Sequence, residues 1–282
     1  MPRFNLSGAC SRLPCPGHSN DGWASGRNAV THQSAIAATL ASALGLAMIS
    51  TAISAAEINF VSSTAMREPL EELVPAFEKA SGHKVVVAFY PAATLVVKVK
   101  EGVPADLVMT TPDNIETLTK DGRLVAGSRV DFAHSSVGVA VRAGAPKPDI
   151  STTEGFKNAL LAAKSVGISK GPSGVYLMKL IDKLGIADQV KAKAVSPDLG
   201  VRVGTLVAKG EAEIGVQQVN ELLPIAGIDF VGKLPKELQT VIVYGAARGT
   251  NAKEWPAAEA LVKYLTSPAA AAILKKLGLE PA

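Results

Sequence analysis

The segment Lys84–Asp113, KVVVAFYPAATLVVKVKEGVPADLVMTTPD, decides the fold. It reads as a strand at 84–89, a helix at 92–102 and a second strand at 105–109. A further helix then starts at Pro112, because proline is favoured at the first helical position. Strands joined by a helix of this length lie parallel in one sheet, so the segment predicts an α/β fold.

The same alternation extends over most of the chain. Upstream, a short strand at 57–61 precedes a helix whose apolar residues recur at helical spacing, from Leu70 to Phe77. Downstream, strands are predicted at 137–141, 166–168, 212–216 and 240–244, and helices at 151–163, 172–184, 200–209, 221–225, 254–265 and 268–277. A capping box, Ser151–Glu154, opens the first of these helices.

The length of the chain predicts two lobes. It has 282 residues, more than one hydrophobic core usually fills, and no flexible linker divides it. We therefore expect two lobes that share strands, with crossovers between the lobes near 134–138 and 241–246. Lobe 1 comprises residues 57–136 and 244–282, and lobe 2 comprises residues 137–243.

The N-terminal region has the layout of a secretory signal. Three arginines precede the apolar, uncharged segment Ser34–Ala56, which ends in small residues. We predict a cleavable signal peptide at 1–56 and export to the periplasm. The alternative, a membrane anchor, is disfavoured because no basic cluster follows Glu57. Cleavage would remove both cysteines, Cys10 and Cys15.

Composition excludes several classes of protein. With 48% hydrophobic and 19% charged residues the chain is not disordered. A net charge of +4 and only 5% aromatic residues argue against binding of nucleic acid. The sequence contains no metalloprotease, serine hydrolase, P-loop or dinucleotide-binding motif. We therefore predict no catalytic residues, no metal and no cofactor, and a binding protein rather than an enzyme.

Four strand-to-helix turns carry small or hydroxyl residues. Free N–H groups at helix N-termini bind anions, and ligands of α/β sheets bind beyond the carboxyl ends of the strands. The turns therefore predict a small-anion site in a cleft between the lobes, although plain helix capping would use the same residues. The candidates are Ser62, Ser63 and Thr64; Ala92 and Thr94; Ser173 and Gly174; and Gly200 and Val201.

At these residues the sequence resembles a known family. Phe89–Asp113 is similar to the pattern F-A-S-S-S-T-L…I-x-x-G-x-P-A-D-L-x-x-S-A-D of the periplasmic molybdate-binding proteins of ABC importers. Further similarity lies at 77–82, 171–176 and 265–270, so the resemblance covers nearly all of 58–279. It implies a two-lobed type II periplasmic binding protein fold, each lobe a mainly parallel sheet flanked by helices. It also implies a monomer that binds a small oxyanion without a metal and delivers it to an ABC permease and its ATPase.

The family's ligand-binding positions match this chain only in part. They fall at Ser62, Ser63 or Thr64, at Ala92 with Thr94 nearby, at Ser173, at Gly200 or Val201, and at Gln218 beside Gln217. Ala92 lacks the family's serine hydroxyl, and Gln218 replaces its tyrosine. The ligand is expected to be a molybdate- or tungstate-like oxyanion or a small organic anion. Because an amide carries both a donor and an acceptor, we predict weaker molybdate binding than is usual in the family and a preference for a protonated or organic anion. An alternative stays open, in which the amide of Gln218 only donates and the ligand is unchanged.

Two other functions use the same cleft. A secreted enzyme would show turnover that a single substitution abolishes. A ligand sensor would report to a membrane receptor, and only a permease and an ATPase encoded nearby would separate the importer from the sensor.

Overall fold

The computed structural model describes residues 55–282, so nearly all of the predicted signal peptide lies outside the described residues. The described residues belong to one compact unit. Among residues 55–282, no helix has the length and apolar character needed to cross a membrane.

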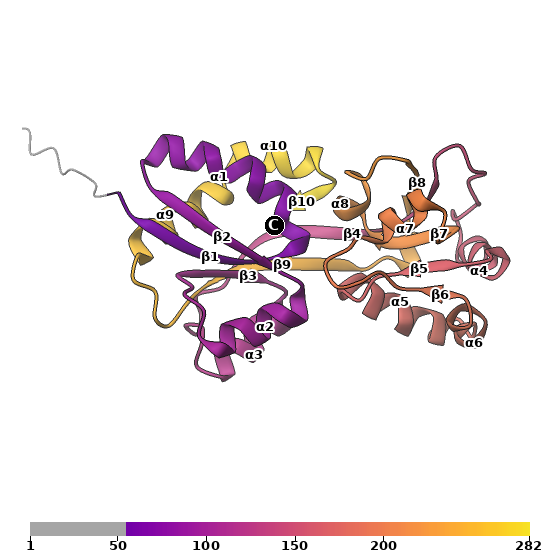
Figure 1. Ribbon diagram of the computed structural model, residues 1–282, viewed down its shortest axis with the longest axis horizontal. Helices are drawn as coiled ribbons and strands as arrows, with labels where there is room; N and C mark the ends of the chain where they lie inside the picture. Colours follow the sequence, from indigo (N-terminus) through magenta and orange to yellow (C-terminus); the bar gives the residue numbers. More distant parts are fainter. Residues whose placement is uncertain (1–54) are drawn as a thin grey trace, which may run out of the picture. The chain divides into compact units, whose positions relative to one another are not determined.

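Strands and helices alternate from one end of this unit to the other (Figure 1). The strands are β1 (Glu57–Ser63), β2 (Lys84–Tyr90), β3 (Leu107–Thr110), β4 (Val130–Arg142), β5 (Val166–Ile168), β6 (Ala194–Val195), β7 (Ile214–Gln218), β8 (Ile228–Lys233), β9 (Val241–Arg248) and β10 (Leu279–Pro281). The α-helices are α1 (Arg67–Ser81), α2 (Ala92–Glu101), α3 (Pro112–Lys120), α4 (Thr153–Ala162), α5 (Pro172–Lys183), α6 (Ala187–Lys191), α7 (Val203–Lys209), α8 (Val219–Leu222), α9 (Trp255–Leu265) and α10 (Pro268–Lys276). Two 3₁₀ helices are η1 (Thr64–Met66) and η2 (Lys236–Leu238).

The strands follow one hydrogen-bonded path in the order β2-β1-β3-β9-β4-β7-β5-β6, and β8 and β10 pair with β4. We call β2, β1, β3, β9, β10 and residues 130–136 of β4 the first sheet, and β7, β8, β5, β6 and residues 137–142 of β4 the second sheet. β1 pairs in parallel with β2 and β3, and β5 pairs in parallel with β6 and β7. Within residues 55–282, every antiparallel pairing involves β4 or β9.

β4 connects the two sheets. It pairs with β9 up to Ser136 and with β7 from Val137 onward, within the 134–138 region where the sequence predicts a crossover. Figure 1 shows β4 running from the indigo and yellow elements to the orange ones, with β9 beside it. The division into lobes at these strands stays a prediction.

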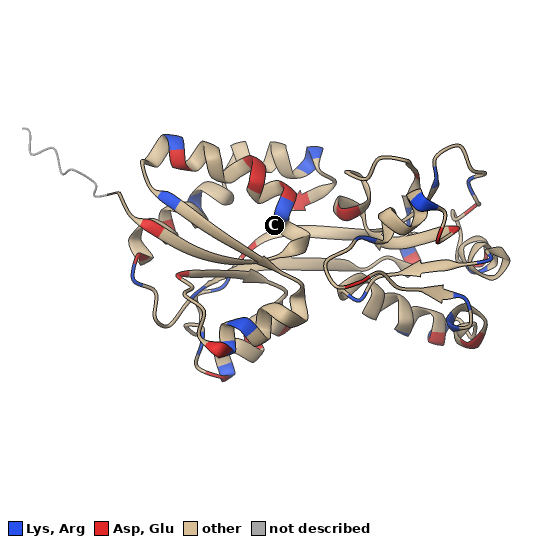
Figure 2. Ribbon diagram, viewed as in Figure 1, with Lys and Arg blue, Asp and Glu red and all other residues tan. Residues whose placement is uncertain are grey.

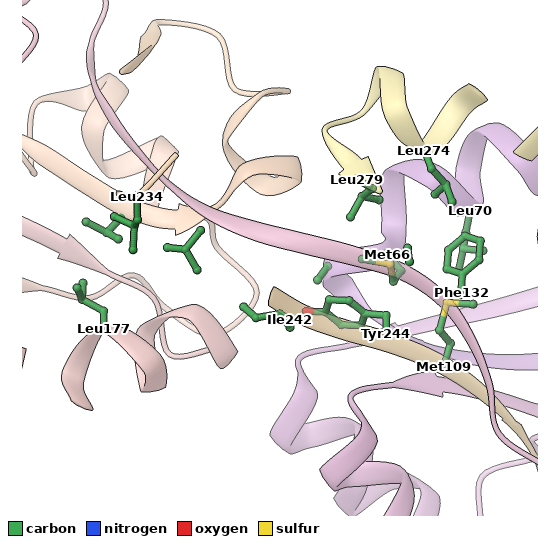
Figure 3. Packing of buried hydrophobic residues seen from close by; sticks show 14 of the residues in the cluster. Met66, Leu70, Met109, Phe132, Leu177, Leu234, Ile242, Tyr244, Leu274 and Leu279 are labelled. Carbon is green, nitrogen blue, oxygen red and sulfur yellow. The ribbon is translucent and has the colours of Figure 1, made fainter. Parts of the chain in front are cut away.

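The α-helices form because their apolar faces are buried. In α1, Leu70, Leu73 and Phe77 are all buried, and the helix ends at Gly82, whose φ of 75° suits glycine. One core cluster contains buried residues of both sheets. Figure 3 shows members of this cluster around β9 and β4, such as Tyr244 and Phe132, and others away from these two strands, such as Leu177 of α5.

Asp106 explains the P-A-D part of the family pattern. Its Oδ2 accepts the backbone N–H of Asn59 at 2.8 Å, and its Oδ1 accepts that of Lys253 at 2.7 Å. Burial raises the pKa of Asp106, but these backbone donors outweigh it and hold the pKa below its usual value. Asp106 thus ties β1 to the segment before α9 and has a structural role.

Several predicted boundaries differ from those in the structure. The side chain of Thr152 caps α4 by accepting the N–H of Gly155, so the capping residue is one position later than predicted. α7 begins at Val203 rather than at residue 200, and β4 is longer than predicted because it serves both sheets. β6, β8 and β10 were not expected from the pattern.

Candidate functional site

A cavity of about 570 Å³ is lined by turns and helix starts from both sheets. Its lining residues are Ser63, Thr64, Ala65, Arg67, Glu68, Phe89, Pro91, Ala92, Ala93, Ser169, Lys170, Gly171, Pro172, Asp198, Leu199, Gly200, Val201, Arg202, Thr205, Gln217, Gln218 and Glu221. In Figure 2 most charged residues lie on helices and loops, and the middle of β4 and β9 carries none. Cationic and acidic side chains from the helices and loops next to both sheets line this cavity.

The structure places the predicted binding residues in two sets. Seven line the cavity, namely Ser63, Thr64, Ala92, Gly200, Val201, Gln217 and Gln218. Four do not line it, namely Ser62, Thr94, Ser173 and Gly174. Their contact with a ligand stays a prediction in each case.

The turn after β1 distinguishes its three candidates. Ser62 is fully buried, and its hydroxyl lies 3.4 Å from the carbonyl oxygen of Ser63. Ser63 and Thr64 reach the cavity, and the Ser63 hydroxyl accepts the N–H of Ala65 at 3.4 Å. Of the three, Ser63 and Thr64 are therefore placed to meet a ligand.

The turn after β2 leads into a helix whose N-terminus has no side-chain cap. Pro91 is the N-cap of α2, and no side chain caps this helix. Ala92 and Ala93 line the cavity, so the first-turn N–H groups of α2 lie beside it. Thr94 does not contribute its hydroxyl to the lining.

In the turn after β5, a side chain of the turn itself accepts hydrogen bonds from the backbone N–H groups. The Ser169 hydroxyl accepts the N–H groups of Gly171 at 3.3 Å and Gly174 at 3.1 Å, and it lies 3.1 Å from the Ser173 hydroxyl. A Cβ at Gly174 would lie 1.7 Å from the Ser169 carbonyl oxygen. Packing thus requires glycine at position 174. The Ser169 hydroxyl, which the sequence analysis missed, accepts backbone N–H groups of this turn that were expected to bind an anion.

The two glutamines are used inside the protein. Gln217 is 3% exposed, and its Oε1 accepts the N–H of Val203 at 2.8 Å. Gln218 is 1% exposed; its Oε1 accepts the hydroxyl of Tyr244 at 3.0 Å and its Nε2 donates to Oε2 of Glu221 at 2.7 Å. Both ends of the Gln218 amide are therefore occupied by side chains of the protein, namely the Tyr244 hydroxyl from β9 and the Glu221 carboxyl group.

Glu221 is a titratable group at the cavity wall. Burial raises its pKa from 4.5 to about 7, although the Arg202 guanidinium opposes this shift. Burial also raises the pKa of Tyr244 far above its usual value, with the Glu221 carboxylate adding to the shift. The phenol thus stays protonated, while Glu221 populates both its forms near neutral pH.

Arg202 and Glu68 form an ion pair between the loop before α7 and the start of α1. Both side chains are mostly buried and line the cavity. The second carboxylate oxygen of Glu68, Oε2, is buried and has no hydrogen-bond partner among the described residues. This pair joins the two sides of the cavity.

Two further cations line the cavity. The Arg67 guanidinium lies 4.3 Å from the centre of the Phe89 ring and 3.3 Å from Oε1 of Glu71. Lys170 is exposed and forms no ion pair within the described part. Together with Arg202 they give the lining three cationic side chains, against three acidic ones at Glu68, Asp198 and Glu221.

Sequence reasoning missed these charged residues because they lie outside the turns that it examined. Glu221 follows β7 in a short helix, and Arg202 lies in a loop. Both residues are only partly exposed, and no motif in the sequence marks them. Within residues 55–282, no group of three or more His, Cys, Asp or Glu side chains is arranged to hold a metal ion.

Comparison with known proteins identifies the family. The family model described as bacterial extracellular solute-binding protein matches residues 58–280. The chain is 36% identical over 252 residues to a protein named aconitate isomerase from Pseudomonas sp, covering 85% of this chain and 95% of that one. It is 30% identical over 242 residues to the molybdate-binding protein ModA of Azotobacter vinelandii, covering 84% and 94%.

Solved structures agree with this assignment. The periplasmic molybdate-binding protein of Azotobacter vinelandii superposes with a TM-score of 0.67 at 23% identity, over 79% of this chain and 98% of that one. This likeness gives the fold, which is that of the type II periplasmic binding proteins. The chain therefore belongs to the family of bacterial extracellular solute-binding proteins and is similar to its molybdate-binding members.

Proposed function

We propose that the exported protein is the periplasmic solute-binding component of an ABC importer, and that its ligand is a small organic anion with several carboxylates. Binding proteins of this family deliver small anions to ABC permeases. The observation that carries the choice of ligand is the mixed charge of the cavity lining, which contains three cationic side chains and a glutamate that can hold a proton.

The chemistry of the lining favours a polycarboxylate over a tetrahedral oxyanion. An ionised Glu221 would repel a compact dianion, whereas a larger ligand can place its carboxylates at the cations and present carbon to Glu221. The cavity volume of about 570 Å³ is typical of sites for organic ligands. Aconitate, from which one relative is named, is a tricarboxylate, and Arg67, Lys170 and Arg202 offer it three cations.

A specific observation favours a second candidate, an isomerase of an unsaturated tricarboxylate. A general acid–base works best when its pKa lies near the operating pH. The pKa of about 7 for Glu221 meets that condition at the wall of the cavity. The relative named aconitate isomerase also aligns with most of this chain.

Calorimetry on the protein recovered from the periplasm tests the ligand class. The titrants are cis-aconitate, trans-aconitate, citrate and the saturated propane-1,2,3-tricarboxylate, with molybdate, tungstate and sulfate for comparison. We expect tricarboxylates to bind and molybdate to bind weakly or not at all. Tight molybdate binding without heat from any carboxylate would contradict the proposal.

A further inference from the structure

We propose that Glu221 is a catalytic acid–base that moves a proton between two carbon atoms of an unsaturated tricarboxylate bound in the cavity. This inference rests on the proposed ligand class and adds a residue and a reaction to it. Glu221 stands out because the other acidic side chains of the lining are placed differently. Glu68 is ion-paired to Arg202, and Asp198 is exposed in a loop.

The surroundings of Glu221 hold it in one position. Its Oε2 accepts the Gln218 amide at 2.7 Å, and the Gln218 oxygen accepts the Tyr244 hydroxyl at 3.0 Å. An ionised carboxylate can only accept hydrogen bonds, so the Gln218 nitrogen must face Glu221 and its oxygen must face Tyr244. The chain Tyr244–Gln218–Glu221 is neutral apart from the carboxylate, and it orients Glu221 without neutralising it.

The charged and titratable groups that face Glu221 come from three elements. Arg202 precedes α7, Glu68 belongs to α1 and Tyr244 belongs to β9. Arg202 favours the ionised form of Glu221, whereas burial and Glu68 favour the protonated form. The balance gives a group that can both accept and return a proton near neutral pH.

The reaction balances without any further reactant. The Glu221 carboxylate takes a proton from the ligand methylene that lies next to both a carboxylate and the double bond, so that C–H bond breaks and an O–H bond forms. The electron pair shifts through the double bond toward the carboxylate at its far end. Glu221 then returns the proton to the far carbon of the former double bond, and a new double bond remains at the original methylene.

This shift interconverts geometric isomers of aconitate. The two ends of its carbon skeleton are equivalent in connectivity, so moving the double bond regenerates the same constitution, and the new bond can form with either geometry. Nothing is oxidised or reduced, and no water is consumed. Negative charge develops on a carboxylate during the step, and the cations Arg67, Lys170 and Arg202 line the same cavity.

Proton NMR in D₂O on the exported protein tests the inference, with cis-aconitate as the probe. We expect formation of trans-aconitate and uptake of deuterium at the methylene. Glu221→Gln should lower both rates by about 100-fold or more. The wild-type rate should follow a group titrating near pH 7, and Glu221→Asp should restore part of the activity. Glu211→Gln, an exposed change outside the lining, is the matched control and should behave as the wild type.

Binding of the saturated propane-1,2,3-tricarboxylate is measured on the same samples. It separates a failure of the proposed ligand class from a failure of the proposed role of Glu221. If the wild type binds this analogue but exchanges no carbon-bound proton, the inference is overturned while the proposed ligand class stands. If Glu221→Gln exchanges protons as fast as the wild type, the inference is also overturned. If neither the analogue nor aconitate binds, the proposed ligand class fails, and this inference fails with it.

Discussion

The turn after β5 and the start of α8 after β7 both follow buried strands of the second sheet and both reach the cavity. They use their polar groups in opposite ways. In the turn after β5, the Ser169 hydroxyl satisfies the N–H groups of Gly171 and Gly174. At the start of α8, Gln218 donates a hydrogen bond to the Glu221 carboxylate at the cavity wall. The comparison teaches that a turn matching an anion-binding pattern can be structural, while the unmarked helix α8 places a titratable carboxyl group at the cavity wall.

The largest effect should come from Gly174→Ala. Its Cβ would lie 1.7 Å from the Ser169 carbonyl oxygen, so the turn must shift. We expect the free energy of unfolding to fall by roughly 3 kcal/mol or more, measured by chemical denaturation.

Gly171→Ala in the same turn is the matched control. A Cβ there would meet only the Ser169 hydroxyl, at 3.7 Å, and the backbone is extended, so we expect little change in stability. Equal losses of stability in Gly171→Ala and Gly174→Ala would contradict the claim that packing requires glycine at position 174.

Glu221→Gln should change stability in a pH-dependent way. The folded-state pKa of about 7 exceeds 4.5, so protonated Glu221 favours the folded state. That stabilisation is complete below pH 4.5 and is lost as the pH rises to 7. Glutamine stays neutral, so the free energy of unfolding of the variant should equal that of the wild type at pH 4 and exceed it by about 3 kcal/mol at pH 8. Denaturation across this range measures it, and a difference that is constant with pH would refute a raised pKa.

A smaller loss is expected from Tyr244→Phe. The change removes the donor to the buried Gln218 oxygen, which should cost about 1–2 kcal/mol and loosen the hold on Glu221. Tyr264→Phe is the matched control, because the Tyr264 hydroxyl makes no side-chain hydrogen bond within residues 55–282. Thermal unfolding of both variants measures the difference, and equal losses would contradict a role for the Tyr244–Gln218 contact.

The smallest effect should come from Ser169→Ala, about 1 kcal/mol of stability, because it leaves the N–H of Gly171 without its acceptor, whereas the N–H of Gly174 keeps the Gly171 carbonyl oxygen at 3.0 Å. Calorimetry with the tricarboxylates should show little change in affinity. A large loss of binding would move the functional site toward this turn.

Most of the fold was predictable from periodicity. The strand–helix–strand pattern of 84–113 gave β2, α2, β3 and α3 close to their observed bounds, because each has a regular apolar face. The short strands β6, β8 and β10 carry little pattern of their own, and their pairing with other strands defines them. The helix predicted at 200–209 begins only at Val203 in the structure. The predicted start is too early because no residue of Gly200–Arg202 marks the cap.

The candidate site was predictable only in outline. The turns after β1 and β2 led to Ser63, Thr64 and Ala92, which line the cavity. Glu221 and its partner Tyr244 lie 23 residues apart in the sequence, and only the sheet brings them to Gln218. Charged residues on helices are usually solvated, so the sequence gives no reason to single out Glu221.

A crystal structure of the protein with bound propane-1,2,3-tricarboxylate tests the central claim most directly. The account predicts that the analogue occupies the cavity, with carboxylates at Arg67, Lys170 and Arg202. A methylene carbon should lie about 3–3.5 Å from a Glu221 carboxylate oxygen, the distance of a reactive contact. An analogue bound elsewhere, or one whose carbon atoms all lie away from Glu221, would contradict the account.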